Sequence, residues 1–213
     1  MNNGLDEQAL IHSAQHGDLG AFNHLIDRYQ DLLFRVAYRM LGDENAAADA
    51  AQTAWLAAFR KINEQRGGRF SSWLIRILTN ACYDELRRRH RRGEVPLMPA
   101  DDDGEEHETA EWLLDRSPSV EQQVDTRQLD QAIQQALQQL SPVYRSMIVL
   151  VDIEGFGYEE AALAMHVPLG TVRSRVARGR IALRRQLAAS GALSPDTQGT
   201  PGPLTSASGL RVP

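Results

Sequence analysis

The segment that most constrains the fold runs from Arg69 to Arg92, because it carries two different stripes on one predicted helix. Apolar residues recur at spacings of three and four from Phe70 to Ala81, which predicts a buried helix face. Five arginines fill the last two turns, which is more than the helix dipole requires. A solvated basic face and a nucleic-acid surface, with guanidinium groups on phosphates and Asn80 on a base edge, both fit this pattern. The polar stripe consists of Arg76, Asn80, Asp84, Arg87, Arg88 and Arg91.

Charge is segregated along the chain, although the formal net charge is only −5 at pH 7. Residues 61–92 hold nine Lys and Arg against three acids, and residues 158–185 hold six Arg against two Glu. Between them, residues 94–121 hold ten acids against one Arg. Two basic modules on either side of an acidic connector favour two local nucleic-acid surfaces over a uniformly basic binding protein.

The chain carries little sign of secretion, membrane insertion or enzyme chemistry. Its single cysteine, Cys82, cannot form an internal disulfide, which suits a reducing compartment. We find no signal-like apolar run and no stretch near the ~18 residues of a membrane span, so we expect a soluble, cytoplasmic protein. His12 and His16 have metal-compatible spacing but lack an evident third ligand. Without a P-loop, dinucleotide motif or nucleophile constellation, we expect no metal, no cofactor and no catalytic residue.

The first 93 residues predict four helices with short connections, which form a compact bundle. Gly17–Asp18 and Gly42–Asp43 each place a helix-ending glycine before a capping aspartate. The alanine-rich face of the third helix, from Ala47 to Ile62, allows close packing against the second. The loop Gln65–Arg69 is basic and contains two glycines.

A second helical module follows and ends in a helix-turn-helix layout. Ser141–Pro142 predicts a helix start, and a helix of about eight residues from Tyr158 precedes a turn and a longer basic helix. The turn, the small Ala161 and the clustered arginines favour DNA binding over an ordinary helical hairpin. Val172, Val176, Ile181 and Leu183 are expected to anchor the last helix. The expected contacts in the major groove are Thr171, Arg173, Ser174, Arg175, Arg178 and Arg180.

The predicted fold class is all-α, with two helical domains joined by an acidic flexible linker. We place an N-terminal four-helix bundle at 1–93, the linker at 94–122 and a helix-turn-helix domain at 123–189. Residues 190–213 are rich in Gly, Pro, Ser and Thr and are expected to form a disordered tail. Trp112–Leu114, inside the linker, fits either a short docking turn or a local collapse.

At this point the chain resembles the extracytoplasmic-function (ECF) sigma factors of RNA polymerase, over about residues 18–92 and 123–187. The family pattern F-x-x-W-L-x-x-I-x-x-N-x-x-x-D-x-x-R is matched letter for letter from Phe70 to Arg87. The second domain matches L-x-P-x-x-R from Leu140 to Arg145 and G-T-V-[KR]-S-R from Gly170 to Arg175. His166 stands where a glycine usually ends the first helix of the pair, and a left-handed cap there costs a non-glycine residue about 1 kcal/mol.

The resemblance implies a promoter-specificity subunit and not an enzyme. Its partners would be core RNA polymerase, through Asp49, Gln52 and Trp55, and promoter DNA. An anti-sigma protein would hold the two domains together, and the acidic linker would either mimic nucleic acid near the polymerase active centre or simply stay soluble and extended. The second domain would read the −35 element as duplex. The −10 element would be captured as a single strand by Arg66, Arg69, Arg76, Asn80, Asp84, Arg87, Arg88 and Arg91.

Two other functions remain open from the sequence. A helix-turn-helix repressor or activator that binds duplex DNA without polymerase would explain residues 158–187, but not the helix that carries Asn80. A sigma-like adaptor would still bind core RNA polymerase and promoter DNA but would not start transcription. Promoter-specific transcription in a reconstituted system distinguishes these alternatives from a sigma factor.

Overall fold

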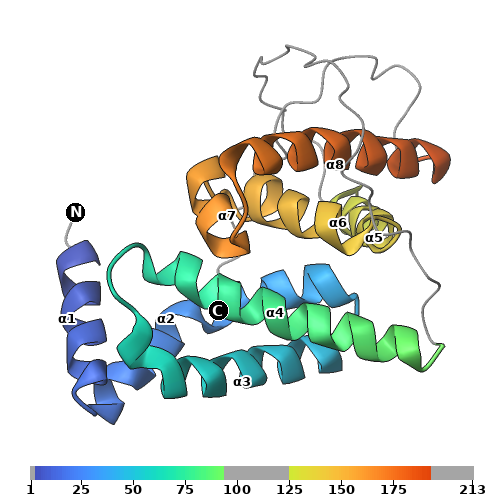
Figure 1. The fold of residues 1–213 in the computed structure, drawn as a ribbon. Helices are drawn as coiled ribbons and strands as arrows, with labels where there is room; N and C mark the ends of the chain where they lie inside the picture. The colour runs from blue at the N-terminus through green and yellow to red at the C-terminus, as the bar shows by residue number, and fades with distance from the viewer. Residues whose placement is uncertain (1–2, 94–124, 193–213) are drawn as a thin grey trace.

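The computed structural model describes residues 3–93 and 125–192, and every regular element in these two ranges is helical. The all-α class predicted from the sequence is therefore confirmed. Figure 1 shows two stacked modules, with α1–α4 below and α5–α8 above. The predicted linker, Trp112–Leu114 and nearly all of the predicted tail lie outside the described residues. None of the described helices is both long enough and apolar enough to cross a membrane.

The N-terminal module is built from four α-helices and one short 3-10 turn. Its elements are α1 (Asn3–Gln15), α2 (Leu19–Leu41), α3 (Glu44–Lys61), η1 (Ile62–Glu64) and α4 (Phe70–Arg91). The predicted helix starts are confirmed, because Asp18 accepts from the amides of Gly20 and Ala21 and Asp43 accepts from that of Ala46. Gly42 ends α2 in the left-handed region, with φ 73°.

The core of this module follows the predicted apolar faces. Phe70, Leu74 and Leu78 of α4 are fully buried, whereas Trp73 is half-buried against the same core. Ala47, Ala54 and Ala58 have no exposed surface, so the backbone of α3 approaches its neighbours closely. The small alanines thus give the tight packing that the sequence predicted.

The C-terminal module contains α5 (Asp125–Gln138), α6 (Pro142–Ile148), a π-helical turn η2 (Val149–Ile153), α7 (Tyr158–Met165) and α8 (Leu169–Ala189). Pro142 occupies the first turn of α6 as predicted, although the Ser141 side chain makes no capping hydrogen bond. His166 ends α7 with φ 54° and ψ 46°, which is the left-handed cap expected at this position. Helices α7 and α8 and their short turn form the predicted helix-turn-helix.

Ile181 was expected to anchor α8, and this prediction is wrong, because its side chain is 69% exposed. The buried positions of α8 are Val172, Val176, Gly179, Leu183 and Leu187, which follow one another at spacings of three and four. Ile181 lies two residues from both Gly179 and Leu183, so it points to the opposite face. Gly179 takes the buried place, and a Cβ there would lie 2.9 Å from Ile148 Cγ1 on α6.

The two modules contact each other at the C-terminal end of α2. The last four carbonyls of a helix have no partner within it and need donors from elsewhere. Here each of them accepts from a side chain, and three of the four donors belong to the C-terminal module. The pairs are Gln134 with Tyr38, Gln138 with Arg39, Arg145 with Met40 and Arg89 with Leu41.

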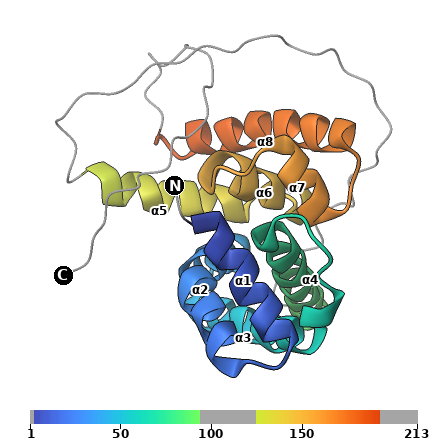
Figure 2. The ribbon, with the colours of Figure 1, turned by 90° about the vertical axis from the view of Figure 1, so that its left-hand side faces the viewer.

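Further polar contacts connect the modules beside this helix end. Arg35 of α2 pairs with Glu154 at 2.9 Å, and the hydroxyls of Tyr83 on α4 and Ser146 on α6 lie 2.8 Å apart. Figure 2 shows α4 running beneath α6 and α7, so the C-terminal module lies along one flank of the helix that carries the polar stripe.

Candidate nucleic-acid interface

The polar stripe of α4 lies in solvent along its whole length. Because its residues share one face and the apolar stripe faces the core, burial of Phe70 and Leu78 turns the arginines outward. The loop that precedes α4 is exposed at Arg66 and Arg69. The structure thus places all eight predicted −10 residues at the surface: Arg66, Arg69, Arg76, Asn80, Asp84, Arg87, Arg88 and Arg91.

These eight residues differ in how they are held. The side chains of Arg76, Asn80 and Arg91 make no hydrogen bond or ion pair with the described part of the chain. Arg87 pairs with Asp84 at 2.6 Å, which orients the guanidinium along the stripe. Arg69 pairs with Glu160 of α7. The Asn80 amide therefore lies between Arg76, whose side chain has no partner among the described residues, and Arg87, which is oriented by Asp84. This arrangement suits contact with a base edge at Asn80 and with phosphates at the arginines.

Arg89 belongs to the same arginine run but has a structural position. Its side chain is only 18% exposed, pairs with Glu85 at 3.2 Å and donates to the carbonyl of Leu41 at 3.2 Å. It thereby joins α4 to the end of α2. This contact explains why the run is longer than a nucleic-acid surface alone would need.

The loop before α4 is fixed at its base and open at its tip. Gln65 is 7% exposed, and its Nε2 donates to the carbonyl of Gly67 at 3.2 Å. Gly67 and Gly68 adopt φ values of 81° and 76°, which favour glycine. Gln15 of α1 donates to the carbonyls of Ile62 and Gln65. The role of Gln15 could not be predicted from sequence patterns, because its partners are backbone atoms 47 and 50 residues away.

The face of α8 that was predicted to bind the major groove is only partly free. Arg173 and Ser174 are exposed, whereas Thr171, Arg175 and Arg178 are half-buried. Arg180 differs from the expectation, because it donates to both carboxylate oxygens of Asp152, at 3.0 and 2.6 Å. Asp152 is 4% exposed, and its hydrogen bond raises the pKa of Arg180. We assign Arg180 to the packing of the module.

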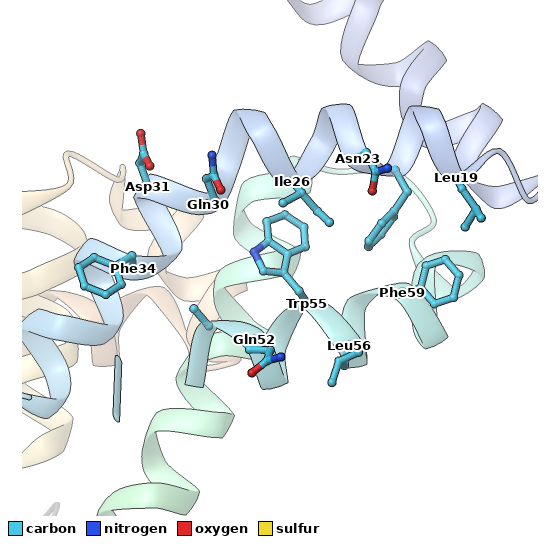
Figure 3. Close-up of a pocket in the computed structure, with 12 residues that line it drawn as sticks. Leu19, Asn23, Ile26, Gln30, Asp31, Phe34, Gln52, Trp55, Leu56 and Phe59 are labelled. Atoms are coloured by element: carbon cyan, nitrogen blue, oxygen red, sulfur yellow. The ribbon is translucent and has the colours of Figure 1, made fainter. Parts of the chain in front are cut away.

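An apolar groove of about 630 Å³ lies between α2 and α3 (Figure 3). Leu19, Phe34, Leu56 and Phe59 line it and are 40–62% exposed, which is unusual for large apolar side chains on adjoining helices. Trp55 points from α3 toward α2 and packs edge-on against Phe22, with ring centroids 5.9 Å apart. Gln52 borders the groove, and Asp49 is exposed one turn earlier on α3.

The two histidines with metal-compatible spacing contact each other and no further ligand. Their ring centroids are 4.3 Å apart, and His16 Nδ1 lies 2.8 Å from the carbonyl of His12. Across the described ranges, no cluster of three or more His, Cys, Asp or Glu side chains has an arrangement that could hold a metal ion.

Comparison with protein families gives two matches, one in each module. The model of Sigma-70 region 2 matches residues 25–92, which include α3, the loop and α4. The model of Sigma-70 region 4 matches residues 130–183, which include α7 and most of α8.

Curated relatives match over most of the chain. The ECF RNA polymerase sigma factor SigE of Mycolicibacterium smegmatis is 38% identical over 168 residues, which are 79% of this chain and 62% of that protein. The ECF RNA polymerase sigma factor SigW of Bacillus subtilis is 34% identical over 181 residues, 83% of this chain and 94% of that protein. The ECF RNA polymerase sigma-E factor of Escherichia coli K12 is 32% identical over 184 residues, which are 86% of this chain and 95% of that protein.

Solved structures share the fold. The sigma factor RpoE of Bartonella quintana, determined in complex with the anti-sigma factor NepR, is 27% identical, with a TM-score of 0.57 over 78% of this chain and 96% of that one. CnrH, determined in complex with the cytosolic domain of CnrY, has a TM-score of 0.61 and covers 86% of this chain and 98% of its own. At 23% sequence identity, this likeness supports the fold alone. The two family models and the curated relatives agree with the resemblance, so the chain belongs to the ECF RNA polymerase sigma factors.

Proposed function

We propose that this sigma factor directs core RNA polymerase to promoters by dividing the reading of DNA between its modules. Helix α4 and the Gln65–Arg69 loop read the −10 element as a single strand, and α8 reads the −35 element as duplex. The observation that carries this proposal is the exposed stripe of α4, where Asn80 lies between Arg76 and Arg87 and its side chain makes no hydrogen bond or ion pair with the described part of the chain. On this proposal, the protein supplies specificity and no catalytic group.

Strand opening sets the energy that the −10 surface must offset. Each unstacked step of duplex costs about 1.4 kcal/mol. Holding an extruded base recovers part of that cost, because a flipped base is read on its Watson–Crick edge and the strand is followed by cations. Asn80 offers a donor and an acceptor on one amide, while Arg76 lies one turn before it and Arg87 two turns after it. Arg66, Arg69, Arg88 and Arg91 extend the phosphate surface on both sides.

Duplex reading falls to the N-terminal half of α8, as in other helix-turn-helix modules. Arg173 and Ser174 are exposed there, and Ser174 Oγ donates to the carbonyl of Thr171 at 3.0 Å. Arg175 and Arg178 complete the proposed surface. Arg180 is not included in this surface, because its guanidinium forms a salt bridge with Asp152.

Core polymerase would dock on the apolar groove between α2 and α3. The exposed Leu56 and Phe59 provide apolar contact area, while Gln52 and Asp31 provide polar atoms at its border. A groove of this kind accepts the apolar face of a partner helix. Trp55 is held in place by its edge-on contact with Phe22. Asp49 adds a negative charge one turn before Gln52 on α3.

We also propose that an anti-sigma protein binds this chain and that the factor acts in the cytoplasm, where the genome and polymerase are found. The Bartonella relative with an anti-sigma partner supports this regulation. Such a partner would act by covering the α2–α3 groove or the α4 stripe.

Run-off transcription with core RNA polymerase and a pool of candidate promoters tests the proposal. Asn80→Ala and Arg173→Ala should each weaken transcription about 5- to 150-fold, since one good base contact is worth about 1–3 kcal/mol. Asn45→Ala, at an exposed position in the first turn of α3, is the matched control and should leave transcription unchanged. Sequence-specific duplex binding without polymerase, together with no transcript, would instead support the repressor or activator function.

A further inference from the structure

We propose that Gln15, at the end of the first helix, is a positioning residue that prepares the Gln65–Arg69 loop to capture a −10 base. This inference rests on the proposed function, because it assumes that the loop receives an extruded base. Gln15 belongs to α1 and precedes the residues matched by either sigma-region model. Its proposed role is therefore outside the surfaces assigned so far.

The Gln15 amide joins two points of the chain that leads into the loop. Its Nε2 donates to the carbonyl of Ile62 at 3.1 Å and to that of Gln65 at 2.9 Å. A glutamine amide has two N–H groups, so both are used. The two carbonyls mark the start of the 3-10 turn η1 and the residue that follows it. Gln15 thus fixes the exit of α3 and the base of the loop together.

A series of hydrogen bonds continues from this point to the tip of the loop. The amide of Gln65 donates to the carbonyl of Ile62 at 3.2 Å, and the buried Gln65 side chain donates to the carbonyl of Gly67. Gly67 and Gly68 then turn the chain, and Arg69 occupies the N-cap position of α4 without a side-chain capping hydrogen bond. Arg66, the two glycines and Arg69 are exposed to solvent, whereas Gln65 is buried, so the base of the loop is held and its tip is available.

Helix α1 is itself fixed, so it can act as a support. Ile11 and Ala14 are buried in the core of the N-terminal module. Glu7 accepts from the Tyr29 hydroxyl and pairs with Arg28 of α2 at 3.4 Å. Burial and this hydrogen bond raise the pKa of Tyr29. In Figure 1 the connection into α4 lies beside α1, which agrees with the two Gln15 contacts.

Such an arrangement affects the captured base more than the rest of the strand. A loop that is already ordered loses less conformational entropy when it receives a ligand, so its affinity is higher. Phosphate contacts along α4 do not depend on the shape of the loop. Loss of the Gln15 donors should therefore lower the preference for a base in the loop, while contacts to the remaining strand are retained.

The test uses holoenzyme and a promoter template whose −10 region is already open. An abasic site is first moved along the −10 strand with wild-type protein, to find the position at which removal of the base weakens binding most. The affinity ratio between the intact and the abasic template at that position is then measured for each variant. Gln15→Leu keeps the side-chain size but removes both donors, whereas Gln15→Lys keeps N–H donors within reach.

Gln15→Leu should lower this ratio about tenfold, which equals about 1.4 kcal/mol. Gln15→Lys should keep it within about twofold, on the same scale of free energy. The matched control is Gln8→Leu, since Gln8 is an exposed glutamine of the same helix. Thermal unfolding of each variant shows whether the module stays folded.

Three kinds of result would overturn the inference. An unchanged ratio for Gln15→Leu, on a template that Asn80→Ala still weakens, would exclude the role of Gln15 and leave the proposed function intact. An equal loss on intact and abasic templates would show that Gln15 only stabilises the module. If no abasic position matters to the wild type and Asn80→Ala has no effect, the proposed −10 surface fails, and the inference fails with it.

Discussion

Gly42→Ala tests whether the two modules pack in solution as they do in the structure. Gly42 has φ 73°, and a Cβ there would lie 2.7 Å from Cδ and 3.0 Å from Cγ of Gln138 on α5. Gln138 would have to move. In its present position Nε2 donates to the carbonyl of Arg39 at 3.0 Å, and Oε1 accepts from Arg145 at 2.9 Å. One methyl group therefore perturbs both the backbone and the contact between modules.

The expected loss is the sum of these two effects. A left-handed conformation costs a non-glycine residue about 1–2 kcal/mol. The neutral hydrogen bond of Gln138 is worth about 0.5–1.5 kcal/mol, and the bond from the Arg145 guanidinium about 1.5–3 kcal/mol. Gly42→Ala should therefore lower the free energy of unfolding by about 3–6.5 kcal/mol. In a Gln138→Ala background only the backbone cost of about 1–2 kcal/mol should remain.

Urea unfolding of wild type, both single variants and the double variant completes a double-mutant cycle. Gly17→Ala is the matched control, because Gly17 has φ 93° and a Cβ there would meet nothing within 4 Å. Gly17→Ala should lower the free energy of unfolding only by the backbone cost of about 1–2 kcal/mol. A coupling energy below about 0.5 kcal/mol between Gly42 and Gln138 would contradict the predicted contact between the modules. Substitutions at residues that do not touch have free-energy effects that add within that limit.

Two further predictions concern the buried thiol and the apolar groove. Burial raises the pKa of Cys82 from 9.0 to about 12, so its contribution to stability is fully present below about pH 9 and is lost toward pH 12. Cys82→Ala should flatten this alkaline decrease in urea unfolding, and an unchanged slope would contradict it. Leu56→Ser should reduce affinity for core polymerase about tenfold, or 1.4 kcal/mol, while changing stability by less than about 0.5 kcal/mol. Ile181→Ser is its control, because Ile181 is also exposed but lies in the other module, and equal losses from both variants would exclude the groove.

Helix positions and ends were predictable because their signals are local. The spacing of Phe70, Leu74 and Leu78 is a property of one helix, and burial of all three confirms it. The caps at Asp18 and Asp43 depend on residues two or three positions away. The stripe of Asn80 was predictable for the same reason, because a helix with one buried face must present the other.

Features that depend on the packing between helices could not be read from the sequence. Ile181 is an ordinary core residue by composition, yet the close approach of α6 at Gly179 decides which face of α8 is buried. Arg180 resembled its neighbouring arginines, but the buried Asp152, 28 residues away, engages it. The exposure of Leu56 and Phe59 likewise follows from the position of α2 relative to α3, which no pattern within α3 contains.

The helices, their caps, the two basic surfaces and the family resemblance all follow from the amino-acid sequence, because each depends on side chains within a few turns of one another. The support of the loop by Gln15 and the capping of α2 by Gln134, Gln138 and Arg145 are visible only in the folded chain. These side chains donate to main-chain carbonyls 47 to 105 residues away. Every residue has such a carbonyl, so the acceptor leaves no mark in the sequence, and only the folded chain brings donor and acceptor together.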